Sequence, residues 1–188
     1  MPKLVLTKTV AMLLVTLGFT AMIPLRALAQ SSSLVDVGVD YNYVRTNLPA
    51  GGCGCFALNG GSSWFAFNFS HSIGLVGELA SQHDSNISYL AGPRYTWAAS
   101  RHFAPFAQVL VGAAHASGAL APGSSGLPGS GNAFAMIAGG GLDIGFTRLI
   151  ALRAIEADYY LTRFDNGVND HQNNLRISAG VIIRFGAK

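Results

Sequence analysis

The sequence has no apolar run beyond residue 29 that is long enough to form a membrane-spanning helix, since such a helix needs about 20 consecutive apolar residues. Charge is also scarce, because only 11% of the 188 residues are charged whereas 50% are hydrophobic. These absences exclude a helical membrane domain in residues 30–188 and disfavour a soluble protein, which would aggregate with so much apolar surface. Strands that expose one apolar face to lipid and close into a barrel satisfy both constraints.

The first 29 residues are predicted to be a secretory signal peptide. Lys3 and Lys8 provide a positive start, residues 10–23 form a short apolar segment, and 27–29 (Ala-Leu-Ala) offer the small residues of a cleavage site. An uncleaved anchor helix is the alternative, but the apolar run falls short of a membrane span. Cleavage after this site leaves 30–188, a length that suits one domain.

The charge of the mature chain differs from that of the whole sequence. Three of the 12 basic residues, Lys3, Lys8 and Arg26, precede the predicted cleavage site, whereas all nine acidic residues follow it. The mature chain then has nine basic and nine acidic residues. This balance removes the main support for nucleic-acid binding, which requires an excess of basic side chains.

The two cysteines, Cys53 and Cys55, lie close together in a glycine-rich segment. Export would permit a disulfide between them, although the ring closed by such near neighbours is small and strained. Half of a tetrahedral metal site is another interpretation, but no second Cys or His pair lies nearby in the sequence. A solvent-facing, redox-labile pair or two free thiols is favoured, and neither a metal nor a cofactor is predicted.

Eight segments alternate apolar and polar residues with the period of a β-strand. Most are roughly ten to fourteen residues long, which suits a tilted strand crossing a bilayer better than a soluble sheet, where strands average about five or six residues. The predicted strands cover 34–45, 62–71, 73–83, 86–98, 102–115, 133–146, 149–163 and 174–185.

The connections between these segments alternate between short and long. Tight connections are predicted at 71–72, 99–101 and 147–148. Long connections are predicted at 46–61, 116–132 and 164–173, and these segments are rich in loop-forming residues. The short connection near 84–85 is an exception to the alternation. An even number of strands would place both termini on the periplasmic side of a membrane barrel and the long loops on the outer side. The 116–132 loop, almost without charge, is expected to be mobile.

Each of the clearest segments has one apolar face and one polar face. In the last segment, Leu175, Ile177 and Ala179 share a parity that opposes Arg176 and Ser178. In a membrane barrel the apolar face would contact lipid and the polar face would contact water. The alternative fold is a soluble β-sandwich, in which the apolar face would form the core. Aromatic residues near strand ends are expected to form interfacial girdles, namely Tyr41, Tyr43, Tyr95, Trp97, Phe103, Phe146, Tyr159 and Phe185.

Several stretches carry a family resemblance, among them Tyr89-Leu-Ala-Gly-Pro-Arg-Tyr95, Phe103-Ala-Pro-Phe-Ala-Gln-Val-Leu-Val-Gly112, Gly139-Gly-Gly-Leu-Asp143 and Ala157-Asp-Tyr-Tyr-Leu-Thr-Arg163. With them the mature chain resembles the OmpA-like and OmpX-like eight-stranded outer membrane β-barrels, in their short stand-alone form. The resemblance implies an all-β, antiparallel, up-and-down transmembrane barrel over 30–188. It also implies a location in the bacterial outer membrane, with its lipids as surroundings.

The C-terminal segment resembles the signal that the outer-membrane insertion machinery reads. The matching positions are Ser178, Gly180, Ile183 and Phe185, and residues 186–188 are a departure, because many such barrels end on the aromatic residue. The resemblance implies that the insertion machinery and periplasmic chaperones are partners during assembly.

The polar face that would point into the barrel carries opposite charges. An eight-stranded barrel is just wide enough for side chains to fill it, and buried charges must pair because an unpaired one is costly. A salt-bridged lumen is therefore predicted, with a narrow polar pore as the functional alternative. The predicted lumen network comprises Asp36, Asp40, Glu78, Arg94, Asp143, Glu156, Asp158, Arg176 and Arg184.

Candidate catalytic and ligand-binding motifs are weak. His115 and Ser117 have a spacing that resembles lipid A deacylase barrels, but the expected acidic partner is missing and Glu156 would have to replace it. The 165–171 segment has oxygen ligands but lacks the terminal Glu of a calcium loop, and the glycines of 139–145 precede no helix, as a nucleotide loop requires. No catalytic residue is predicted.

The sequence therefore favours a structural or surface-interaction barrel, not an enzyme, with a salt-bridged lumen, outer loops and an unknown extracellular ligand. A small passive, porin-like channel is the alternative, because the inward face is polar. A lipid A-modifying hydrolase is a third and less favoured hypothesis.

Overall fold

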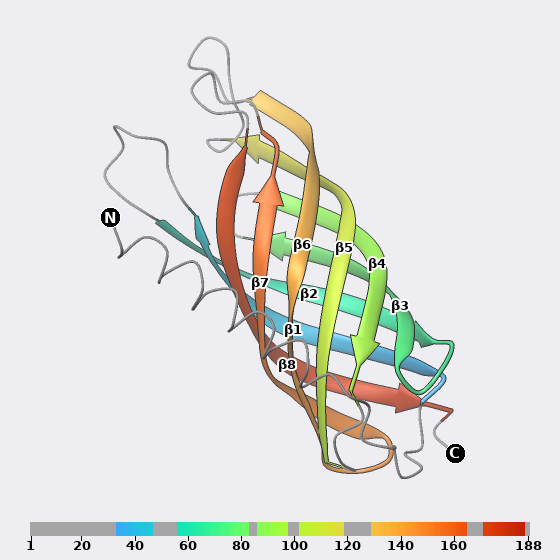
Figure 1. The fold of residues 1–188 in the computed structure, drawn as a ribbon. Helices are drawn as coiled ribbons and strands as arrows, with labels where there is room; N and C mark the ends of the chain where they lie inside the picture. Colours follow the sequence, from blue (N-terminus) through green and yellow to red (C-terminus); the bar gives the residue numbers. More distant parts are fainter. Residues whose placement is uncertain are drawn as a thin grey trace, which may run out of the picture.

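The computed structural model describes residues 33–46, 56–82, 86–97, 102–118, 129–164 and 171–186. They form eight antiparallel strands, each paired with the next along the chain, and β8 pairs with β1 to close a barrel (Figure 1). Among these residues, no helix has the length and hydropathy of a membrane span. The strands are β1 (Val35–Thr46), β2 (Phe56–Asn68), β3 (Ile73–Gln82), β4 (Asn86–Thr96), β5 (Phe103–Gly118), β6 (Gly129–Gly145), β7 (Ile150–Thr162) and β8 (Gln172–Phe185).

The predicted strand number and antiparallel order are confirmed, but some strand boundaries were wrong. β2 begins at Phe56, because the ladder with β1 continues from Val35↔Phe67 to Thr46↔Phe56. β5 and β6 also continue as far as Gly118↔Gly129. These extensions contain Gly, Ser and Asn, which the sequence pattern assigns to loops. Backbone pairing with a neighbouring strand outweighs that preference here.

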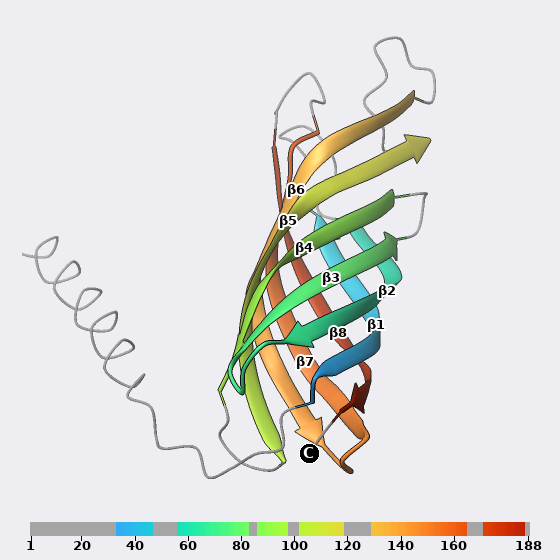
Figure 2. The ribbon, with the colours of Figure 1, turned by 90° about the vertical axis from the view of Figure 1, so that its right-hand side faces the viewer.

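Both ends of the described chain lie at the same end of the barrel. The Leu34 nitrogen donates a 2.9 Å hydrogen bond to the Phe185 carbonyl, which joins the start of β1 to the end of β8. Figure 2 shows the end of β8 beside the start of β1, where Phe185 pairs with Val35. The turns at 69–72 and 146–149 join β2 to β3 and β6 to β7 at this end, which we call the turn end. The opposite end is the loop end.

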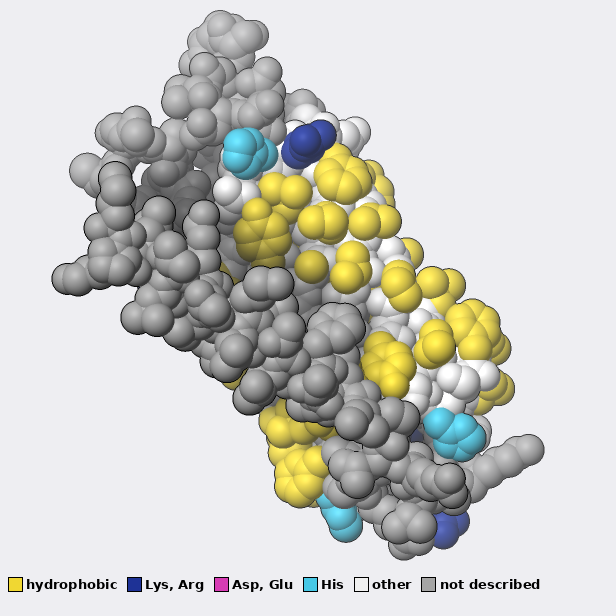
Figure 3. Space-filling view, viewed as in Figure 1, with side chains coloured by type: hydrophobic (Ala, Val, Ile, Leu, Met, Phe, Trp, Pro, Cys, Tyr) yellow, Lys and Arg dark blue, Asp and Glu magenta, His cyan; other side chains and the backbone are white. Residues whose placement is uncertain are grey.

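Side chains alternate between the two faces of the wall, as the strand period requires. In β3 the burial alternates along nearly the whole strand, with Gly74, Val76, Glu78, Ala80 and Gln82 directed inward. The outward face is apolar, and Figure 3 shows it as a broad hydrophobic band along the barrel wall. Exposed aromatic residues lie at the turn end (Phe69, Tyr95, Phe103, Phe146 and Phe185) and toward the loop end (Tyr41, Tyr43, Tyr89, Phe134 and Tyr159).

One irregularity interrupts this alternation in β7. Arg153 pairs with Gly180 and Glu156 pairs with Ser178, so Ala154 and Ile155 together oppose a single residue of β8. Such a β-bulge bends a strand and changes which residues face inward. As a result both Arg153 and Glu156 point into the barrel, although they are an odd number of residues apart.

Candidate functional site: the charged lumen

The middle of the barrel is centred on Arg153 of β7, whose side chain is 0% exposed. Its guanidinium contacts three carboxylates, with nitrogen–oxygen distances of 3.1 Å to Asp40, 3.0 Å to Asp143 and 2.6 Å to Glu156. These partners come from β1, β6 and β7 respectively. Charge-assisted hydrogen bonds of this kind are the stronger ones in proteins, and here they tie distant parts of the barrel wall together.

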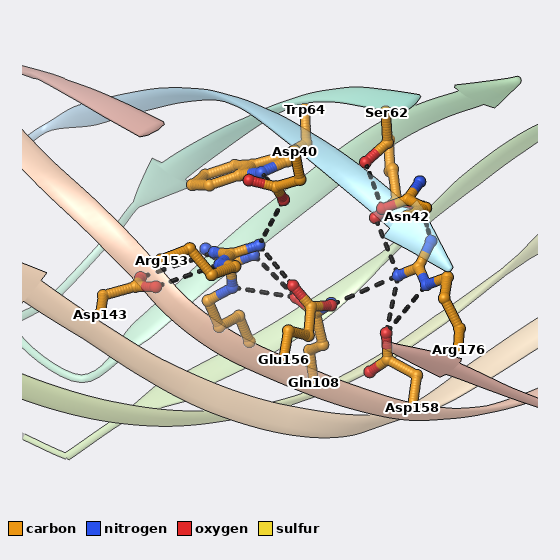
Figure 4. Close-up of polar contacts among 12 residues, drawn as sticks. Asp40, Asn42, Ser62, Trp64, Gln108, Asp143, Arg153, Glu156, Asp158 and Arg176 are labelled. Carbon is orange, nitrogen blue, oxygen red and sulfur yellow. Dashed lines mark hydrogen bonds and ion pairs between the residues drawn. The ribbon is translucent and has the colours of Figure 1, made fainter. Parts of the chain in front are cut away.

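A second arginine, Arg176 of β8, forms the other half of the network and is 2% exposed. Its guanidinium pairs with Glu78 from β3, with Asp158 at 2.7 Å and with Glu156 at 3.3 Å. Glu156 therefore lies between the two arginines and binds both, as Figure 4 shows. The carboxylate of Glu156 joins the two halves of the lumen into one connected cluster.

Gln108 of β5 extends the cluster to Arg94 of β4. Its side-chain oxygen accepts hydrogen bonds from Arg94 at 3.0 and 2.8 Å, and its amide nitrogen donates one of 2.6 Å to Glu156. The neutral amide of Gln108 thus links the Arg94 guanidinium to the Glu156 carboxylate through hydrogen bonds. Gln108 is 3% exposed, so this link is also shielded from bulk water.

Two aromatic rings hold the arginines in place. The guanidinium carbon of Arg153 lies 4.2 Å from the centre of the Trp64 ring and 4.5 Å from that of Phe106. Arg94 lies 4.5 and 4.6 Å from the same two rings. Each ring therefore makes a cation–π contact with two arginines. Such contacts stabilise a protein more when they are buried away from water than when they lie at its surface.

Toward the loop end the lumen becomes less charged. Its inward residues include Val44, Leu58, Leu110, Ile137 and Tyr160, all buried in one apolar cluster against which Phe164 packs. Uncharged polar groups accompany them, such as Ser62, whose hydroxyl donates a 3.3 Å hydrogen bond to Asn42. The barrel therefore has a charged middle and, toward the loop end, a half filled by apolar and uncharged polar side chains.

The structure places most of the predicted lumen residues in this cluster. Asp40, Glu78, Arg94, Asp143, Glu156, Asp158 and Arg176 are buried and connected. Asp36 and Arg184 lie apart, opposite each other in register near the turn end, where Asn68 donates a 3.1 Å hydrogen bond to Asp36. The first group forms one network, and the second belongs to the rim of the barrel.

The sequence pattern missed Arg153, the most connected residue of the lumen. Strict period two assigns Arg153 to the lipid face together with Ile155, and the β-bulge reverses that assignment. Gln108, Trp64 and Phe106 were also missed, because a search for charged residues passes over them. Their inward-facing positions in the alternation of β5 and β2 could have identified them as lumen residues.

The structure does not bring together the residues of the hydrolase hypothesis. Glu156 binds Arg153, Gln108 and Arg176 inside the lumen. His115 has the outward parity of β5, and its ring Nδ1 lies 2.8 Å from the Asn132 side-chain oxygen. Glu156 as the acidic partner of His115 is therefore wrong. Cys53, Cys55 and nearly all of the 165–171 segment lie outside the described residues.

The four positions of the C-terminal motif lie on β8 with different surroundings. Ser178 is buried on the lumen side, and Gly180 faces Asp40, against which a Cβ atom would collide. Ile183 and Phe185 are exposed on the outer surface, and Phe185 lies at the turn end. The motif thus combines two inward positions with two apolar outward ones.

Comparison with known proteins gives a match in structure and none in sequence. No protein-family model and no curated protein matches the chain. Among solved structures, neisserial surface protein A (NspA) is similar with a TM-score of 0.60 and 15% identity over 81% of this chain and 98% of that one. Ail, the attachment invasion locus protein of Yersinia pestis, has a TM-score of 0.52 and 18% identity over 82% and 99%.

A third similar structure is the N-terminal β-barrel domain of Pseudomonas aeruginosa OprF, with a TM-score of 0.54 and 14% identity over 80% of this chain and 97% of that one. The three structures are eight-stranded outer membrane β-barrels. The chain therefore has the fold of an eight-stranded outer membrane β-barrel, and the resemblance noted in the sequence is confirmed for the fold.

Proposed function

We propose that the protein is a structural or surface-interaction barrel of the bacterial outer membrane whose lumen is sealed by its own side chains. The observation that carries this proposal is the burial of Arg153 and Arg176, which are 0% and 2% exposed in the middle of the lumen. An unpaired charge in such a place would be costly, and each arginine is matched by three carboxylates.

The filled lumen argues against the channel hypothesis. Ion passage needs a continuous aqueous path, whereas the side chains of an eight-stranded barrel can fill its interior. Here the charged middle is followed, toward the loop end, by buried apolar and uncharged polar side chains. A passing ion would have to displace both a salt-bridged layer and these uncharged side chains.

The outer surface supports a membrane location. Its exposed residues include many large apolar side chains, for example Val39, Leu79, Ile155 and Val181. In water such a surface would cause aggregation, whereas lipid solvates it. Interaction with the environment would then fall to the loop end, where β1 and β2, β5 and β6, and β7 and β8 are joined through 47–55, 119–128 and 163–171.

Epitope insertion tests the location and the orientation together. One tag is placed between residues 123 and 124, in the connection of β5 and β6, and the matched control tag between Thr147 and Arg148, in the β6–β7 turn. Antibody should label intact cells only through the first tag, and the second should be labelled only after the outer membrane is permeabilised. Labelling of intact cells through the turn tag alone would contradict the proposal.

A further inference from the structure

Charge is segregated across the barrel wall. The six acidic side chains that the structure describes lie on the lumen side or at its rim, namely Asp36, Asp40, Glu78, Asp143, Glu156 and Asp158. The exposed charges of the described outer surface are arginines, Arg45, Arg148 and Arg163. In Figure 3 basic and histidine side chains lie at both ends of the hydrophobic band, and no acidic side chain is visible on that face. The described outer surface is therefore suited to anions, and the three other acidic residues, Asp84, Asp165 and Asp170, lie outside the described residues.

Hydrogen-bond donors gather around one of these arginines at the loop end. The Arg163 backbone nitrogen donates a 2.9 Å hydrogen bond to the Phe134 carbonyl, which places Arg163 beside β6. Asn132, two residues before Phe134, shares the outward face and lies diagonally across from Arg163, within reach of a long side chain. Its side-chain oxygen contacts the His115 ring nitrogen at 2.8 Å.

A second asparagine lies on the other side of Arg163. Asn173 of β8 accepts a 2.5 Å hydrogen bond from the Tyr159 hydroxyl on its side-chain oxygen. Thr162 pairs with Gln172, and Leu175 pairs with Arg45. Asn173 therefore lies on β8 between the positions that face Arg163 on one side and Arg45 on the other.

The two asparagines are oriented alike, with the amide oxygen occupied by a neighbour. For Asn132 this assigns the hydrogen to Nδ1 of His115, since an oxygen accepts but does not donate. Among the described residues, neither asparagine donates a side-chain N–H group to a partner, so both can donate to another molecule. Together with two guanidinium groups, which only donate, they form the outer-rim donor patch, defined as Arg45, Asn132, Arg163 and Asn173.

We propose that the outer-rim donor patch binds the phosphate groups of a phosphorylated glycolipid in the surrounding outer leaflet. This inference rests on the proposed location and orientation of the barrel. Phosphate oxygens are acceptors that guanidinium and amide donors bind well. The exposed rings of Tyr43, Phe134 and Tyr159 lie on the same surface, where aromatic side chains suit the boundary between headgroups and acyl chains.

A binding experiment tests this proposal. Fluorescently labelled lipopolysaccharide is added to the refolded mature protein in zwitterionic micelles, and fluorescence anisotropy measures its binding. Arg163→Gln and Arg45→Gln should each weaken binding by about fivefold, since one basic side chain near an anionic surface contributes on the order of 1 kcal/mol. Enzymatically dephosphorylated lipopolysaccharide should bind the wild-type protein more weakly than the intact lipid. The matched control is Arg148→Gln, which removes an exposed arginine at the turn end and should leave binding unchanged.

Equal affinities for wild-type and Arg163→Gln protein, or an equal loss in Arg148→Gln, would overturn the inference. Heat-dependent gel mobility, measured on each variant, verifies that the barrel is folded. A protein that binds without regard to phosphate but retains heat-dependent mobility would contradict the glycolipid site alone. Failure of the wild-type protein to form a heat-modifiable barrel would contradict the proposed membrane function as well.

Discussion

Trp64 donates a 2.7 Å hydrogen bond from its indole nitrogen to Oδ2 of Asp40. The same oxygen accepts a 3.1 Å hydrogen bond from Arg153, whose guanidinium carbon lies 4.2 Å from the centre of the Trp64 ring. One carboxylate oxygen thus fixes both an aromatic ring and the cation stacked on it. This three-residue unit joins β1, β2 and β7 across the lumen.

Replacing Arg153 with Met should strongly destabilise the barrel. The variant keeps a long side chain but leaves Asp40, Asp143 and Glu156 without this cation. Removing one partner of a buried ion pair costs about 3–5 kcal/mol, and urea unfolding in micelles or bilayers would measure that loss in the free energy of unfolding. Arg163→Met, on the outer surface, should change it by less than about 0.5 kcal/mol. Equal unfolding midpoints for the two variants would contradict the network.

Trp64 should report on the lumen by its fluorescence. The chain has two tryptophans, so Trp97→Phe leaves Trp64 as the only one. Because Trp64 is 3% exposed, its emission in the folded barrel should resist quenching by acrylamide and become accessible after unfolding. Strong quenching in the heat-modifiable form would show that water reaches the ring and that the lumen is open.

Gly38→Val should prevent normal folding of the barrel. A Cβ atom at Gly38 would overlap the indole ring of Trp64, and overpacking of this kind costs about 1–3 kcal/mol or more. Gly131→Val is the matched control, since nothing lies within 4 Å of a Cβ there. The heat-modifiable fraction on gels distinguishes the two. Equal fractions would mean that Trp64 does not occupy the position described.

We propose that Phe185 is part of the signal read during membrane insertion. Phe185→Ala should leave processed protein in the periplasm, where proteases degrade it, whereas Phe146→Ala should insert normally. Both rings are exposed at the turn end, Phe185 at 51% and Phe146 at 66%, so a general girdle effect would affect them equally. Cell fractionation and heat-dependent mobility measure the outcome. Equal insertion of the two variants would reduce Phe185 to an ordinary interfacial aromatic.

Gly180 cannot serve in the same test. A Cβ at this position would collide with the Asp40 side chain and the Val39 carbonyl. Any substitution therefore disturbs the folded barrel, whether or not the glycine is recognised during assembly. Phe185 separates the two effects because its side chain lies on the outer surface.

The sequence pattern predicted the barrel because its wall follows simple periodicity. Alternation placed Glu78, Asp158 and Arg176 inward, and the structure has them there. Arg153 could not be placed, because a β-bulge depends on pairing with β8, which leaves no mark in the periodicity. The start of β2 at Phe56 was missed for a related reason, since Asn59 and Gly60 favour a loop until β1 pairs with them.

The sequence alone did not predict which lumen residues contact one another, because the partners are far apart in the sequence. Gln108 joins Arg94 to Glu156, and no local pattern relates these three positions. Parity shows that each side chain points inward, whereas the curvature and stagger of the wall decide which of them meet.

Ion conductance tests the central claim most directly, because a sealed lumen and a narrow pore differ in that property. The refolded mature protein is inserted into planar bilayers, and insertion is verified by heat-dependent mobility of the recovered protein. The paired arginines and the buried, uncharged side chains toward the loop end predict a silent membrane. Discrete single-channel steps from the wild-type protein that change when Arg94 or Glu78 is replaced would contradict the sealed lumen and establish the channel instead.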